Sequence, residues 1–266
     1  GSVTSGVVNL TNRQDIVQFE VGMTLNAAQT DGGTLESGVG YIISINRSAG
    51  SFVVSDTSVS GAAGTPTGWS NGDYLLVKGD KNLKIKGLDA WLPETAPTSG
   101  DNFFGVDRSV DTVRLAGVRY DGSAQSIEEA LIDGSSEVAI NGGKPDVAIM
   151  TYASYSALEK SLGSKVQYVD LKGPADIAFR GIMVNGANSM IRCFPDRNQL
   201  PQVCSLLQMN TWCLEGLGDC PQILRYGDGL EMLRVYNADA GQVRVGYYAQ
   251  LRTNAPGWNG RIKLGA

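Results

Sequence analysis

Hydrophobic and polar residues alternate most regularly near the C-terminus, where the pattern predicts a strand from residue 243 to residue 251. One face of this strand would carry Val243, Val245, Tyr247, Ala249 and Leu251. The opposite face would carry Gln242, Arg244, Tyr248, Gln250 and Arg252. We expect the first face to pack in a core. The second would face either solvent or a neighbouring molecule, because Arg and Tyr are enriched at protein contacts.

Short hydrophobic runs separated by turn residues fill the first part of the chain. Strands are predicted where β-branched and aromatic residues gather, at residues 16–25, 39–46, 51–54 and 73–78. Four residues ending in Gly50 separate the second and third runs, so we expect a hairpin in which Gly50 is left-handed. Residues 58–72 are small and polar, which is typical of a loop. Residues 1–87 therefore predict a β-rich unit, either a small barrel or a sandwich.

Helical signals begin at residue 126. Ser126 is followed three residues later by Glu129, which matches a capping box and predicts a helix whose middle is weakened by Gly134. The apolar run 147–150 predicts a buried strand, after which Thr151 would cap a second helix ending near residue 163. A short alternating strand is predicted at 166–169, and strands and turns continue from residue 177 onward. This region is expected to be mixed α/β.

The segment 88–119 has two prolines and little periodicity, which predicts an extended linker. Its charged side chains include Asp107, Arg108, Asp111 and Arg114. We expect these residues to form ion pairs on the surface, where each pair contributes about 0–1 kcal/mol. In an assembly, the same charges could set the register between subunits.

The composition favours a globular, β-rich protein. The chain has 266 residues, of which 42% are hydrophobic and 18% charged, and its 34 glycines greatly outnumber its 9 prolines. Its net charge is −5 and it lacks the basic patch expected of a nucleic-acid binder, so we expect no sequence-specific nucleic-acid partner. No apolar stretch approaches the ~18 residues of a membrane span, so we expect no membrane partner.

Residues that could carry catalysis are scarce. The chain has no histidine, which removes the commonest general base and metal ligand. Cys193, Cys204, Cys213 and Cys220 match no usual zinc spacing, so we interpret them as buried free thiols, with disulfides as the alternative. The glycine-rich residues 226–229 lack the features of a phosphate loop and predict a hairpin turn. We therefore predict a protein that is not an enzyme, with no catalytic, cofactor-binding or metal-binding residues.

The order of several motifs across about two thirds of the chain points to a family. The motifs are WLP at 91–93, FFGVDRSVDTVRLAGVRYDG at 103–122, SIEEALID at 126–133, SLGSKVQYVDLKG at 161–173, LLQMNTWCLEGLG at 206–218 and GLEMLRVYNADAGQVRVGYYAQLRTNAPGWNGRIKL at 229–264. In this order they resemble the major capsid proteins of tailed bacteriophages with the Hong Kong 97-like fold.

This resemblance implies an α+β fold with an axial and a peripheral domain. The axial domain would comprise residues 120–231, and the peripheral domain would take its strands from residues 88–119 and 232–266. Residues 1–87 would form a β-rich, barrel-like insertion domain. Members of the family also have an N-terminal arm, an extended loop and a long spine helix, and residues 1–87 contain no pattern for such a helix. We expect either that these elements lie upstream or that the architecture is reduced.

The resemblance further implies a structural subunit of an icosahedral virus shell. Copies of the chain would assemble into pentamers and hexamers around a phage genome, in the host cytoplasm, and would remain in the virion. Decoration, portal or scaffolding proteins are the other expected partners. At the level of residues, we expect Arg252, Trp258 and Arg261 in the interface between subunits, because they lie in the aromatic and basic C-terminal segment.

Two other classes of protein stay open. A shell protein of a cellular encapsulating compartment would share the fold, but would enclose enzymes in place of DNA. A phage decoration or tail binding module would explain the glycine-rich strands, although it would not call for the capped helices that begin near residues 126 and 151.

Overall fold

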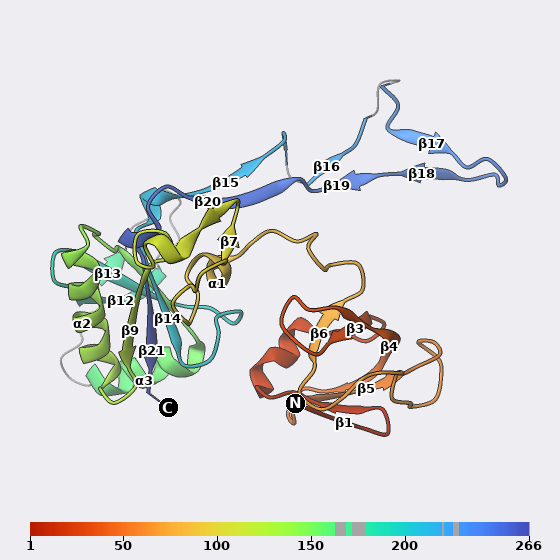
Figure 1. The fold of residues 1–266 in the computed structure, drawn as a ribbon, viewed down its shortest axis with the longest axis horizontal. Helices are drawn as coiled ribbons and strands as arrows, with labels where there is room; N and C mark the ends of the chain where they lie inside the picture. Colours follow the sequence, from red (N-terminus) through yellow and green to blue (C-terminus); the bar gives the residue numbers. More distant parts are fainter. Residues whose placement is uncertain (163–168, 172–178, 220, 226–228, 266) are drawn as a thin grey trace.

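The computed structural model describes residues 1–162, 169–171, 179–219, 221–225 and 229–265. These residues form mixed α/β structure in which sheets predominate and helices are few (Figure 1). Two separate apolar cores are present. The first takes its residues from within the first 77 positions, and the second takes its residues from between Val113 and Leu264.

The N-terminal unit is one antiparallel sheet that curls around the first core. Its strands lie in the order β1-β2-β5-β4-β3-β6, with bounds β1 (Ser2–Thr4), β2 (Val7–Asn9), β3 (Thr24–Ala28), β4 (Leu35–Asn46), β5 (Ser51–Ser55) and β6 (Tyr74–Val77). A short 3-10 helix, η1 (Arg13–Gln18), packs Ile16 into the core. The predicted hairpin is confirmed, since β4 and β5 pair across a four-residue turn and Gly50 has a φ of 70°.

A seven-stranded sheet organises the second core. Its strands lie in the order β11-β12-β13-β10-β14-β21-β9, with bounds β9 (Val118–Gly122), β10 (Val147–Met150), β11 (Val169–Leu171), β12 (Phe179–Asn185), β13 (Met190–Pro195), β14 (Val203–Leu207) and β21 (Gly260–Leu264). Neighbours are antiparallel except for two parallel pairs, β10 with β13 and β21 with β9. The predicted strand at 147–150 is thus confirmed. The predicted strand at 166–169 and the predicted turn at 226–229 lie largely outside the described residues.

Two helices, α2 (Ile127–Ile140) and α3 (Tyr152–Leu162), cover one face of this sheet (Figure 1). Both predicted starts are confirmed. Ser126 and Glu129 form a complete capping box, and the Thr151 hydroxyl accepts a 3.2 Å hydrogen bond from the backbone N–H of Ser154. Gly134 does more than weaken α2, because a Cβ at this position would lie only 2.5 Å from Ile262 Cδ1. The missing side chain lets the helix lie close to β21.

The segment 88–119 is more structured than the extended linker predicted from its sequence. It forms a one-turn helix α1 (Leu88–Trp91), a small hairpin of β7 (Asn102–Phe103) and β8 (Val106–Asp107), and a 3-10 turn η2 (Arg108–Val110). Arg114 and Asp111 form the expected exposed ion pair at 3.9 Å. The expectation for Arg108 was wrong, since this residue is buried and pairs with Asp101. Its aromatic neighbours, described below, account for the burial.

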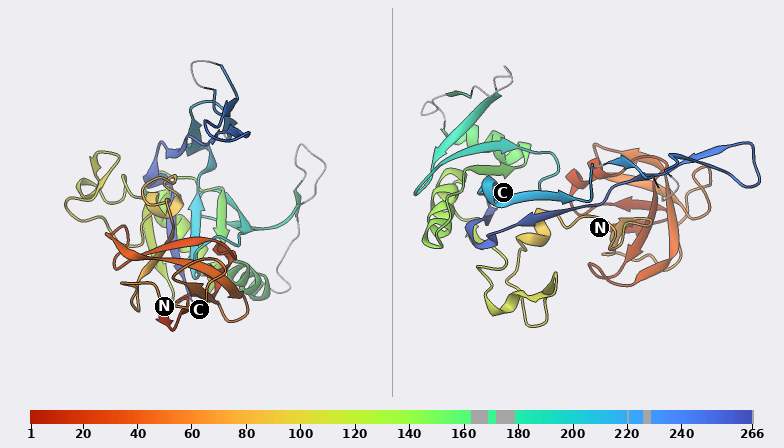
Figure 2. Two further views of the ribbon diagram at one scale, coloured as in Figure 1. Left: turned by 90° about the vertical axis from the view of Figure 1, so that its right-hand side faces the viewer. Right: turned by 90° about the horizontal axis from the view of Figure 1, so that it is seen from above.

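The prediction of one long strand at 243–251 was wrong. The structure divides it into β18 (Gly241–Val243), β19 (Val245–Gly246) and β20 (Ala249–Thr253), which pair with β17 (Met232–Arg234), β16 (Gln222–Ile223) and β15 (Trp212–Gly216). Together the described residues of 212–253 form a thin antiparallel arm that extends from the body (Figures 1 and 2). Val243, Val245 and Tyr247 are therefore exposed and do not pack in a core.

Replacing Leu131 with alanine tests the second core. Leu131 is fully buried against the sheet, so Leu131→Ala should lower the free energy of unfolding by about 2–5 kcal/mol. Its neighbour Ile132 is partly exposed on the outer side of α2, and Ile132→Ala should cost less than about 1 kcal/mol. Urea denaturation followed by circular dichroism would measure both values. Equal losses would contradict the described orientation of α2.

Candidate subunit interface

The arm contains ten of the 25 large apolar and aromatic side chains that are exposed among the described residues. Ten of its apolar and aromatic residues are at least 47% exposed, namely Leu214, Leu217, Ile223, Leu230, Met232, Tyr236, Val243, Val245, Tyr247 and Tyr248. Aromatic side chains offer about 150–250 Å² each and aliphatic ones somewhat less, so the ten side chains summed leave on the order of 1,000 Å² in solvent. The arm therefore concentrates exposed apolar side chains along one thin ribbon.

The base of the arm is firmly attached to the body. The indole N–H of Trp212 donates a 2.8 Å hydrogen bond to Asn259 Oδ1, and Asn259 is fully buried. The indole N–H of Trp91 donates a 3.1 Å bond to the carbonyl oxygen of Leu251. Trp91 and Trp212 also meet edge to face, with ring centroids 6.4 Å apart. These contacts fix the direction in which the arm leaves the body.

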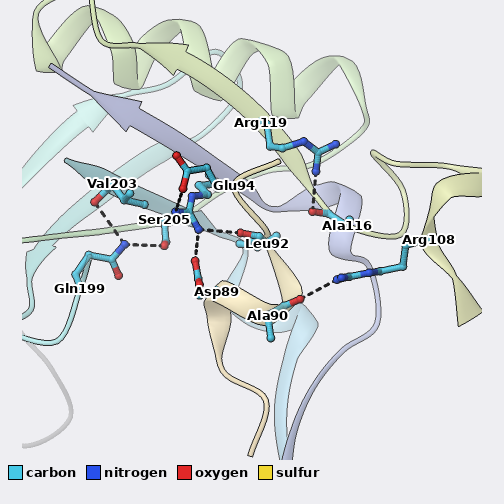
Figure 3. A network of polar contacts seen from close by, with 11 residues as sticks. Asp89, Ala90, Leu92, Glu94, Arg108, Ala116, Arg119, Gln199, Val203 and Ser205 are labelled. Atoms are coloured by element: carbon cyan, nitrogen blue, oxygen red, sulfur yellow. Dashed lines mark hydrogen bonds and ion pairs between the residues drawn. The ribbon is translucent and has the colours of Figure 1, made fainter. Parts of the chain in front are cut away.

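Arg261 lies inside the molecule and joins α1 to the sheet. Figure 3 shows its partners Asp89, Leu92 and Glu94. It is 9% exposed, and its guanidinium group pairs with Asp89, lies 3.7 Å from Glu94 Oε2 and donates a 3.3 Å bond to the carbonyl oxygen of Leu92. It also lines a cavity of about 320 Å³ together with Gln199. Its donors are thus used within the chain, and a role of Arg261 in a subunit interface stays a prediction.

Two further arginines brace the segment that follows α1 (Figure 3). Arg108 stacks over the ring of Phe103 at 4.3 Å, pairs with Asp101 at 2.9 Å and donates a 2.7 Å bond to the carbonyl oxygen of Ala90. Arg119 donates to the backbone carbonyls of Ala116 and Thr112. Burial lowers the pKa of Arg119, and the nearby charge of Arg108 lowers it further. The charge pattern alone did not predict this network, because the burial comes from aromatic residues elsewhere in the segment.

The two other predicted interface residues are accessible and belong to different elements. Arg252 extends from β20 and pairs with Glu215 of β15 at 2.6 Å, with both side chains about half exposed. Trp258 lies in the 3-10 turn η5 (Pro256–Trp258) next to Gly142 and is 42% exposed. The structure thus places Arg252 and Trp258 at the surface and Arg261 in the interior. Their role in a subunit interface stays a prediction.

The cysteines and the carboxylates are the remaining candidates for a reactive or metal-binding site. Cys193 and Cys204 are free and buried as expected, and Cys213 is free but exposed, so the expectation of burial was wrong for Cys213. Cys220 lies outside the described residues. A cavity of about 500 Å³ in the N-terminal unit is lined by Asp15, Asp73 and aromatic residues including Trp69. Burial raises the pKa of Asp15, and a hydrogen bond from Asn12 partly offsets this. Within the described part of the chain, no three Cys, Asp or Glu side chains gather as a metal site.

No protein-family model matches the chain, and no curated protein matches it at a significant level. Among the described residues, no helix is long and apolar enough to cross a membrane.

Removing the Arg261 side chain should loosen α1. Arg261→Ala deletes the hydrogen bond to Leu92 and both carboxylate contacts, so the free energy of unfolding should fall by about 1–3 kcal/mol. The loss stays modest because Asp89 and Glu94 are largely exposed and can be hydrated. Arg114→Ala is the control, with an expected change within about 0.5 kcal/mol. Thermal and urea unfolding measure both, and equal effects would contradict the internal role of Arg261.

Thiol labelling should separate the cysteines. Burial raises the pKa of the Cys193 thiol to about 12 and that of Cys204 well above its ordinary value. Because the thiolate is the reactive form, neither thiol should react with a maleimide at pH 8 while the protein is folded. Cys213 is exposed and should react readily. Peptide mapping by mass spectrometry locates the label, and rapid labelling of Cys193 in folded protein would contradict this result.

The same pKa shift sets a pH dependence. The folded state keeps the Cys193 proton up to about pH 12, whereas the unfolded state releases it near the ordinary value of 9.0. The unfolded state therefore binds fewer protons above pH 9, so the stability contributed by this thiol should fall as the pH rises from about 9 to 12. Cys193→Ala should reduce that slope in urea titrations relative to Cys213→Ala. An unchanged slope would contradict the assignment.

Proposed function

We propose that the chain is a structural subunit that assembles with copies of itself into an icosahedral virus shell. The observation that carries this proposal is the arm, which leaves roughly 1,000 Å² of apolar and aromatic surface uncovered, comparable to the ~800 Å² per partner of a standard interface. A two-stranded ribbon is also only marginally stable alone in water. An interface with neighbouring copies would cover the arm and stabilise it.

The motif order adds the finer description to this proposal. In it the fold is the Hong Kong 97-like capsid fold, with residues 120–231 as the axial domain and residues 88–119 and 232–266 as the peripheral strands. Residues 1–87 are then an insertion domain, which agrees with their separate apolar core. The subunits form pentamers and hexamers around a genome that they enclose without reading its sequence. The chain performs no catalysis in this proposal.

Repetition of one interface supplies the energy of assembly. In closed symmetric rings, each copy makes two equivalent contacts with its neighbours, so contacts of modest strength accumulate over the particle. The net charge of −5 is compatible with enclosing nucleic acid, because a strongly basic wall would hold it at every phosphate. In the virion, decoration, portal and scaffolding proteins are the expected additional partners.

Introducing charged residues into the middle of the arm should abolish assembly. Leu217 and Val245 are 78% and 67% exposed, so Leu217→Glu with Val245→Glu should leave the fold intact but place two carboxylates in the proposed interface. We expect the particle or ring mass to be lost while the circular dichroism spectrum is unchanged. Light scattering over a range of protein and salt concentrations measures this.

The matched control places the same substitutions outside the arm. Val59 and Val110 are 53% and 81% exposed, so Val59→Glu with Val110→Glu should assemble like the unmodified protein. If the arm variant also assembled normally, the arm would not be the interface. If the unmodified protein stayed near 28 kDa under all conditions, a monomeric binding module would be the better hypothesis.

A further inference from the structure

Positive charge is concentrated in the linker between the two cores. Four of the nine lysines of the chain, Lys78, Lys81, Lys84 and Lys86, lie within nine residues, where Asp80 is the one acidic residue. Lys84 pairs with Asp80, and the Lys81 ammonium group donates to the carbonyl oxygen of Gly33. Leu83 between them is 81% exposed, and Ile85 is also exposed. We refer to residues 78–86 as the basic linker.

Negative charge is concentrated on the outer face of α2. Glu129, Asp133 and Glu137 follow one another at intervals of four residues, so they form a row along the helix, and α2 contains no Lys or Arg. Two apolar side chains accompany this row, Ile132 at 38% and Ile140 at 77% exposure. Among the described residues, no ion pair involves a carboxylate of α2. We refer to these five residues as the acidic face.

Desolvation and the row of carboxylates together raise the pKa of the neighbouring Tyr120 hydroxyl. The Tyr120 hydroxyl donates a 3.2 Å hydrogen bond to Asp133 Oδ2, and Gln125 donates a 2.9 Å bond to the same oxygen. Desolvation raises the pKa of Tyr120, and the charges of Asp133 and Glu137 raise it further. Like charges at this spacing destabilise a helix slightly, and an oppositely charged partner would relieve the repulsion.

The basic linker and the acidic face cannot meet within one molecule. Side chains alternate along β21, so Ile262 points to the helices, whereas Arg261 points to the other face of the sheet. Arg261 pairs there with Asp89 of α1, and the basic linker leads directly into α1. The seven-stranded sheet thus separates the two charged surfaces (Figures 1 and 2).

We propose that the basic linker of one copy docks on the acidic face of the next copy. Lys84 and Lys86 would meet the carboxylate row, while Leu83 and Ile85 cover Ile132 and Ile140. The contact joins two different surfaces, so it is head to tail, and such contacts close into rings when the rotation between copies permits. This inference rests on the proposed self-assembly and assigns one of its interfaces, separate from the arm.

Two charge-reversed variants test the docking. Variant A carries Asp133→Lys and Glu137→Lys, and variant B carries Lys84→Glu and Lys86→Glu. In each variant alone, the two surfaces have the same sign, so self-association should weaken at least about tenfold. Mixing A with B pairs opposite charges again and should restore association. Sedimentation velocity from low to high salt measures these effects, and added salt should weaken association of the unmodified protein.

A control variant, Glu20→Lys with Asp56→Lys, makes the same change in net charge as variant A on the exposed surface of the N-terminal unit. It should associate as the unmodified protein does, and circular dichroism would verify that all variants are folded. If A and B associate normally while the unmodified protein forms particles of defined mass, the docking is wrong and the shell proposal stands. If charge-dependent association yields only open chains of undefined mass, the docking stands and the closed shell fails. A monomer under all conditions overturns both.

Discussion

Strand β21 connects the parts of this protein, because its side chains alternate between two faces and each face contacts a different element. Ile262 and Leu264 point into the core beneath α2, whereas Arg261 points to the opposite face and binds α1. Just before the strand, the side-chain oxygen of the buried Asn259 accepts a hydrogen bond from the indole N–H of Trp212, which fixes the base of the arm. One strand therefore orients the two helices, α1 and the arm. If its register shifted by one residue, these faces would be exchanged.

The arm and the two charged surfaces share one property. Within a single chain, the apolar side chains of the arm have no layer to cover them, and the two charged surfaces cannot pair with each other. A two-stranded ribbon has no second layer against which to pack, so its apolar side chains stay in solvent. The acidic face and the basic linker lie on opposite sides of a sheet, so their charges cannot pair within the molecule. Such features are costly in a monomer and useful in an assembly. They support self-association more directly than any cavity or titratable group described above.

Local interactions made several elements predictable. The capping box at Ser126 and Glu129, the cap at Thr151 and the left-handed Gly50 all depend on residues within a few positions of one another. The clustering of lysines at 78–86 was equally visible in the sequence, but the low overall positive charge concealed it. By contrast, the burial of Arg108 depends on Trp91 and Phe103, whose arrangement no local pattern specified.

The sequence by itself determined where α2, α3 and the turn at Gly50 lie and that strands predominate. The strand predicted at 16–25 was wrong, because residues 13–18 form η1 and β3 begins only at Thr24. The tertiary structure decided which face of a strand is covered, because alternation reports two faces but not what packs on either. It placed Val245 in solvent and Arg261 in the interior, contrary to the pattern. It also decided that the acidic face and the basic linker are separated by a sheet, since that separation follows from the order of strands and from no single segment.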